Sequence, residues 1–145
     1  MYHAIVKRRL RAAYRRVGAG DYDAVLSICV PEVHVRVPGE GPLSGTFESV
    51  QEYERWFERV FTLAASLHFD IVELLVEGPP WNTRVAVVWV DTVTAHDGAT
   101  YVNEGAQFIH MRWGRLTSLH YRWNTELVTR ALDHATRAGI EVEAG

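Results

Sequence analysis

The strand pattern of the segment Thr83–Ala95 places one carboxyl group, that of Asp91, among apolar side chains. Asp91 shares strand parity with Val85, Val87 and Trp89 in the segment Thr83–Ala95, so we expect it to point toward an apolar cavity. Burial there would raise the pKa of the carboxyl and let it exchange protons near neutral pH. The alternative is that Asp91, close to the end of its strand, reaches water and pairs with an arginine or a loop amide.

Three further polar side chains fall on apolar strand faces. Tyr121 alternates with Leu119 and Trp123, and a buried phenol there would either stabilise an oxyanion or be a core tyrosine with one satisfied partner. Asn103 and Gln107 share a parity on the preceding strand, where buried amides need partners. They would either orient a ligand carbonyl or bond each other and the backbone.

Other residue types exclude several classes of function. The seven histidines lack metal-site spacing, the single cysteine excludes an internal disulfide, and no glycine-rich phosphate loop is present. We therefore expect no metal and no cofactor. The arginines near the N-terminus fit a solvated helix face, and with a net charge of −3 they predict no nucleic-acid partner. The apolar runs are too short to span a membrane, which makes a cytoplasmic protein the default expectation.

The elements that must position these side chains follow from periodicity and turn signals. The spacing of Val6, Leu10 and Val17 predicts a helix that stops at Gly18. Asp21 is a candidate N-cap for a second, short helix that Pro31 would end, and Ser49 with Glu52 forms a capping box that opens a third. Strands are predicted at 33–37, 67–77, 83–95, 100–112 and 115–123, with a C-terminal helix beginning at Asn124 or Thr125 and ending at Gly139.

This order predicts a single α+β domain spanning residues 1–145. Helices would pack on one face of a curved antiparallel sheet and enclose a conical cavity. The strand at 83–95 is apolar on both parities, so the other face of the sheet also needs a cover. A second subunit is the economical cover, and we therefore expect a homodimer through the sheet face.

The element order and three local strings resemble the nuclear transport factor 2-like superfamily, and more closely its SnoaL-like branch. The strings are Gly18–Asp23, Val35–Phe47 and Met111–Tyr121. The resemblance implies a cone-shaped pocket, helices on the concave face of the sheet and, usually, a dimer. It is specific for fold rather than activity, because the superfamily holds isomerases, cyclases, hydrolases, dehydratases and non-enzymatic binders.

The catalytic sets of these enzymes are each incomplete in this chain. The carboxylate base of the ketosteroid isomerase-like enzymes would fall on Val37, their oxyanion tyrosine on Ala13 and their protonated aspartate on Ile109. In the limonene-epoxide-hydrolase-like set, Asp91 is kept, whereas Trp89 replaces the arginine and Tyr121 the second aspartate. An enzyme of this kind would need a different constellation.

The sequence thus indicates a pocket protein for a small apolar or polycyclic ligand. If it is catalytic, Asp91 would transfer protons and Tyr121 would polarise a carbonyl, in an isomerisation, cyclisation, dehydration or hydrolysis without a cofactor. The alternative is a non-catalytic ligand-binding or assembly module of the same fold. The ligand-binding residues are predicted to be Tyr14, Trp56, Phe57, Phe61, Trp89, Asn103, Gln107 and Met111.

Overall fold

The computed structural model describes residues 1–123 of the chain, which form helices and strands in the predicted order. The three helices are α1 (Tyr2–Gly18), α2 (Asp23–Leu26) and α3 (Val50–Leu63). The strands are β1 (Cys29–Val37), β2 (Gly45–Phe47), β3 (Ala64–Glu77), β4 (Thr83–Ala95), β5 (Thr100–Arg112) and β6 (Arg115–Trp123). The predicted C-terminal helix lies outside the described residues.

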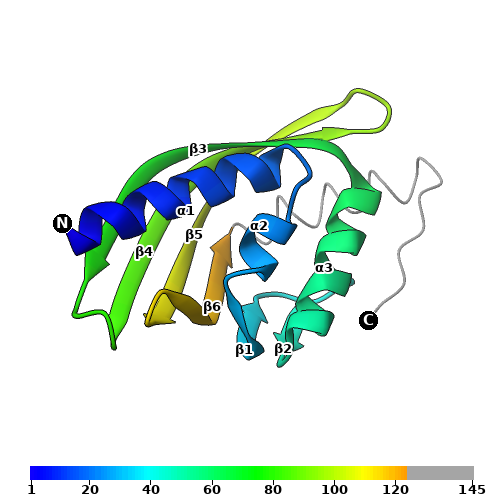
Figure 1. Ribbon diagram of the computed structural model, residues 1–145. Coiled ribbons are helices and arrows are strands. Elements are labelled where there is room, and N and C mark those ends of the chain that lie inside the picture. Colours follow the sequence, from blue (N-terminus) through cyan, green and yellow to red (C-terminus); the bar gives the residue numbers. More distant parts are fainter. Residues whose placement is uncertain (124–145) are drawn as a thin grey trace.

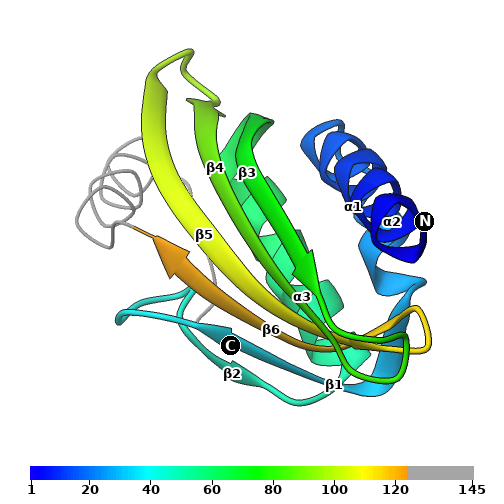
Figure 2. The ribbon, with the colours of Figure 1, turned by 90° about the vertical axis from the view of Figure 1, so that its left-hand side faces the viewer.

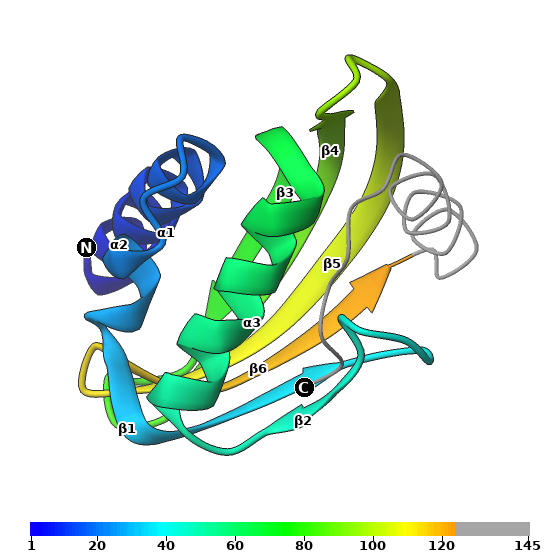
Figure 3. The same cartoon turned by 90° about the vertical axis from the view of Figure 1, so that its right-hand side faces the viewer.

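The strands form one strongly curved sheet in the order β2-β1-β6-β5-β4-β3. All neighbouring pairs are antiparallel except β1 and β6, which run parallel. The helices lie on the concave side of the curve, and no described element lies over the convex side (Figures 2 and 3). The predicted α+β architecture with helices on the concave face is therefore confirmed.

The helices are placed by the apolar faces that the sequence shows. Helix α1 packs along β3 (Figure 1). Its buried residues are Val6, Leu10, Ala13 and Val17. Helix α3 begins as predicted, because the Ser49 side chain accepts a hydrogen bond from the Glu52 backbone. The Glu52 carboxylate accepts a hydrogen bond from the backbone N–H of Glu48, not from that of Ser49 as a capping box would predict.

Several local predictions need correction. Helix α2 begins at Asp23 with Tyr22, not Asp21, at its N-cap. Strand β1 begins at Cys29 and continues through Pro31, and the short strand β2 had not been predicted. Pro31 is tolerated because it falls in the gap of the β1–β6 register between Cys29 and His34, where its missing N–H costs no ladder bond.

The register of the sheet brings the candidate polar residues together on its concave side. Burial along β4 alternates, with Val85, Val87, Trp89 and Asp91 buried. Asp91 lies directly opposite Asn103 on β5. Gln107 lies opposite Tyr121 on β6. The side chains of Asp91 and Trp89, which share a parity, therefore face the helices.

Residues 1–123 contain neither a membrane-spanning helix nor a candidate metal site. None of the helices there is long and apolar enough to cross a membrane. No group of three or more histidine, cysteine, aspartate or glutamate side chains in this part of the chain could hold a metal ion.

Candidate functional site

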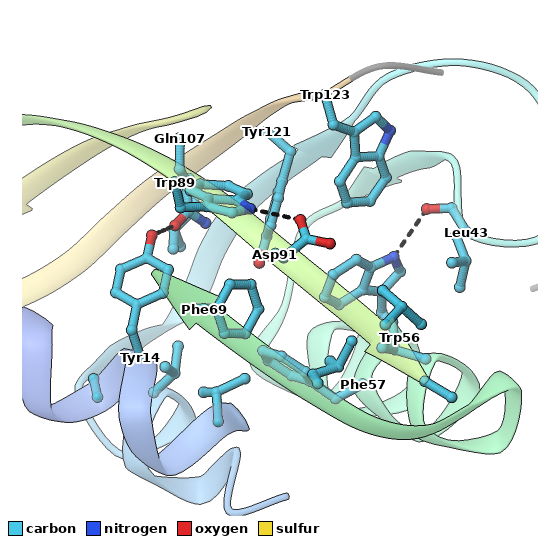
Figure 4. Close-up of a pocket in the computed structure, with 18 of the residues that line it drawn as sticks. Tyr14, Leu43, Trp56, Phe57, Phe69, Trp89, Asp91, Gln107, Tyr121 and Trp123 are labelled. Atoms are coloured by element: carbon cyan, nitrogen blue, oxygen red, sulfur yellow. Dashed lines mark hydrogen bonds between the residues drawn. The ribbon is translucent and has the colours of Figure 1, made fainter. Parts of the chain in front are cut away.

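A cavity of about 170 Å³ lies between the helices and the concave side of the sheet. For comparison, an engineered apolar cavity of about 150 Å³ holds a benzene molecule. Helices α1 and α3 form one wall, and strands β3 to β6 form the other (Figure 4). Its polar lining comes from Tyr14, Tyr53, Asp91, Tyr101, Asn103, Gln107 and Tyr121, and most of the remaining lining is aliphatic or aromatic.

Most of the predicted site residues line this cavity. They are Tyr14, Trp56, Phe57, Trp89, Asp91, Asn103, Gln107 and Tyr121. Trp56 is buried, and its indole N–H donates to the Leu43 carbonyl at 2.8 Å.

Two residues predicted to line the cavity are not among its lining residues. Phe61 lies on the side of α3 that faces α2, where it stacks on Tyr22 at 5.8 Å between ring centroids. Met111 sits opposite Thr83 near the end of its strand, fully buried in the core and outside the cavity lining.

Asp91 is buried and held by its strand neighbour. Only 7% of the residue is exposed, and the Trp89 indole N–H donates to Oδ2 at 2.8 Å. Burial raises the pKa of the Asp91 carboxyl, and the hydrogen bond from Trp89 partly opposes that rise. The carboxyl can therefore exchange protons closer to neutral pH than an exposed aspartate can.

Gly105 allows Trp89 to adopt this position. The two residues lie opposite each other on β5 and β4, and the indole covers the glycine. A Cβ added at Gly105 would lie 2.6 Å from Cζ2 and 2.9 Å from Nε1 of Trp89. A side chain at this position would thus push the indole away from the sheet and from Asp91.

Three phenols and one amide form a connected hydrogen-bond network along the cavity. The Tyr14 hydroxyl donates to Gln107 Oε1, and the Gln107 side chain also bonds Tyr121. The hydroxyls of Tyr121 and Tyr53 lie 2.6 Å apart. The network therefore joins α1, β5, β6 and α3 through side chains that lie far apart in the sequence.

The phenols of this network are neutral hydrogen-bond donors. Burial raises the pKa values of Tyr14, Tyr53 and Tyr121 above that of an exposed tyrosine. One phenolic hydrogen is used toward Gln107 and one between Tyr53 and Tyr121. The third has no acceptor in this network, so it can donate to a carbonyl oxygen or an oxyanion in the cavity.

Two buried polar atoms have no hydrogen-bond partner in the part of the chain that the structure describes. They are Oδ1 of Asn103 and Nε1 of Trp123. The Trp123 nitrogen is directed away from Asp91 (Figure 4). The Asn103 amide, by contrast, belongs to a residue that is 7% exposed, lines the cavity and lies opposite Asp91.

Sequence reasoning missed Phe69 as a wall residue. Its ring meets Tyr14 and Trp89 edge to face at 5.7 and 6.0 Å between centroids. The signal available was strand parity, because Phe69 lies opposite Asp91 on β3.

The position of the isomerase base is occupied by Val37, which is buried and takes no part in the cavity lining.

Comparison with solved structures finds the same fold in several proteins. An NTF2-like protein of unknown function from Burkholderia pseudomallei has a TM-score of 0.76 at 21% identity, over 87% of this chain and 95% of that one. TerC, co-crystallised with polyporic acid, has a TM-score of 0.75 at 21% identity, over 88% and 98%. PrhC from Penicillium brasilianum has a TM-score of 0.74 at 14% identity, over 93% of each chain.

Sequence comparison identifies the family. No curated protein sequence matches the chain. The sequence profile of the SnoaL-like domain matches residues 10–119, which contain α3, β1 to β5 and nearly all of the cavity lining. With an NTF2-like fold and this match over most of its length, the chain belongs to the SnoaL-like domain family.

Proposed function

We propose that the protein binds a small, apolar, oxygenated molecule in the cavity and transforms it by acid–base chemistry without a cofactor. The observation that carries the proposal is a buried carboxyl, Asp91, in a cavity whose walls are otherwise mainly apolar. A cavity with a few convergent polar groups and a carboxyl of raised pKa is typical of ligand and active sites.

The reaction classes that fit are isomerisation, cyclisation, dehydration and hydrolysis. Asp91 would take or give the proton, and the Tyr53–Tyr121 pair of the phenol network would donate to a developing oxyanion. Asn103 and Gln107 would orient the ligand, and the indole of Trp89 with the rings of Tyr14 and Phe57 would form its apolar wall.

One comparison supports a ring-shaped, oxygenated ligand. TerC, which shares the fold, has been crystallised with polyporic acid. For this chain we infer a ligand of the same general kind, a ring compound with oxygen substituents.

The second candidate is a ligand-binding or assembly module without catalysis. It is favoured by the loss of the family's catalytic sets, since Val37 and Ile109 replace ionisable groups. Both candidates use the same cavity. Turnover of a bound ligand distinguishes the enzyme from the non-catalytic module.

Native mass spectrometry of the purified protein should detect a co-purified small molecule, and the unliganded protein should bind members of a ketone, epoxide and polyketide-like panel. Turnover of a bound member supports the enzyme. Binding of several members without turnover of any supports the binding module. A protein that binds none of them contradicts both candidates.

We also propose that the convex side of the sheet forms a homodimer interface. Apolar side chains are exposed there, with Leu75 56%, Val88 39% and Phe108 52% exposed. They lie on neighbouring strands with the parity opposite to Asp91. An apolar face of this kind would be covered by a second copy of the chain related by a two-fold axis.

Phe108→Asp should convert the dimer to a monomer, because it places a charge in the centre of the apolar interface. Sedimentation velocity over a wide concentration range measures the change. Trp113→Asp is the matched control, since Trp113 is also apolar and exposed, at 67%, but lies in the β5–β6 turn. A wild-type protein that sediments as a monomer at every concentration would refute the interface.

A further inference from the structure

The Asn103 amide is the strongest unexplained feature of the cavity. Its oxygen has no hydrogen-bond partner in the part of the chain that the structure describes. Because the residue is only 7% exposed, bulk water does not supply that partner freely. A buried amide without partners is rare in folded proteins, and it is typical of a group that a ligand satisfies.

The neighbour of Asn103 adds a second acceptor at the same place. Asp91 lies directly opposite on β4, where side chains of paired residues come within about 5.5 Å of each other. Its Oδ2 accepts from Trp89, and Oδ1 makes no hydrogen bond with any described residue. This end of the cavity therefore offers two acceptor oxygens, one from each side chain.

Two donors of the cavity are already engaged. The Trp89 N–H is used by Asp91, and the Tyr14 hydroxyl is used by Gln107. The spare phenolic hydrogen belongs to the Tyr53–Tyr121 pair. A ligand hydroxyl can donate its hydrogen to the unpartnered Asn103 oxygen, whereas a ligand carbonyl has no hydrogen to donate.

We propose that Asp91 and Asn103 together bind a hydroxyl group of the ligand, so that the pocket selects a hydroxylated ring compound such as a phenol or an enol. The inference rests on the proposed function and names its ligand class. It reverses the role expected for Asn103, because its oxygen accepts from a hydroxyl instead of its amide N–H donating to a carbonyl.

Three naphthalene probes test the selection, because they share a ring system and differ in one substituent. Naphthalene has no polar group, 1-methoxynaphthalene can only accept, and 1-naphthol can donate. Equilibrium dialysis should show that the wild-type protein binds 1-naphthol about tenfold more tightly than 1-methoxynaphthalene, the factor expected for one hydrogen bond to a buried, partly charged pair.

Asn103→Leu should remove most of this preference and leave the affinity for 1-methoxynaphthalene within about twofold. Val102→Leu is the matched control, since it introduces the same side chain on the same strand at an exposed position of the opposite face. That control should keep the wild-type preference.

Thermal unfolding without ligand gives a second, independent readout. Asn103→Leu should raise the midpoint, because it replaces an unpartnered buried amide with an apolar side chain of similar size. A lower midpoint would show that the amide is a paired structural group and would overturn the inference.

The outcomes also separate this inference from the proposed function. Equal affinity for 1-naphthol and 1-methoxynaphthalene overturns the hydroxyl site alone, since the cavity still binds ring compounds. No binding of any of the three probes overturns the proposed function and the hydroxyl site with it.

Discussion

Asp91→Asn should lower turnover of a bound substrate by about 100-fold or more, an effect much larger than any change in its affinity. Asparagine keeps an oxygen that accepts from the Trp89 indole, so the position of the side chain should be preserved. It cannot take or release a proton at neutral pH, and the loss of a general acid or base costs about 10²–10⁴ in rate. Steady-state kinetics resolves this as a change in kcat that is much larger than the change in KM.

The same substitution should increase stability. Burial raises the folded-state pKa of Asp91 above the ordinary 3.8, so the folded protein binds this proton more tightly than the unfolded chain does. Wild-type stability therefore falls as pH rises from 3.8 through the raised pKa and stays lower above it. Asp91→Asn lacks this titration, and its advantage in the free energy of unfolding should be present at pH 7 and absent below pH 3.8.

Two variants serve as controls for the effect of Asp91→Asn on turnover and affinity. Asp91→Leu removes the acceptor for Trp89 and should lose affinity as well as turnover. Asp70→Asn removes a carboxyl from an exposed site on β3 and should change neither. Wild-type turnover in Asp91→Asn would contradict the catalytic role of Asp91, and a pH dependence of unfolding like that of the wild type would contradict its raised pKa.

Gly105→Ala should destabilise the protein by about 1–3 kcal/mol and weaken ligand binding. Alanine is normally the better strand residue, so the expected sign is opposite to the usual one. The reason is local, because the new methyl group would lie 2.6 Å from the Trp89 ring and force the indole off the sheet. Chemical denaturation measures the loss.

A double-mutant cycle identifies the cause. Trp89→Phe shortens the ring, so Gly105→Ala should cost much less in that background than in the wild type. Because phenylalanine has no N–H for Asp91, the double variant should recover stability without recovering turnover. Additive losses in the two variants would show that the methyl group and the indole do not collide.

The long strands could be predicted because their ends carry strong local signals. Strands β4, β5 and β6 have the expected bounds, since Asp97-Gly98 and Trp113-Gly114 define their turns. At the second turn, Trp113 and Gly114 both have positive φ, at 51° and 77°. Strand β2 could not be predicted, because three residues give no periodicity and their pairing with β1 is a tertiary contact.

The composition of the cavity followed from strand parity, but its hydrogen bonds did not. Parity alone placed Asp91 and Trp89 on one face. The bond between them depends on the indole lying flat over Gly105, and the contact of Tyr53 with Tyr121 joins residues 68 positions apart. Pairing register and side-chain rotamers decide such contacts, and neither can be read from a periodic pattern.

The five tryptophans are divided between two environments. Trp56, Trp89 and Trp123 line the cavity, whereas Trp81 and Trp113 are 55% and 67% exposed at the turns that join β3 to β4 and β5 to β6. An aqueous quencher such as iodide reaches the exposed pair first and removes the red-shifted part of the emission. The remaining fluorescence comes from the three indoles that surround the cavity, so the protein contains its own optical reporter of occupancy.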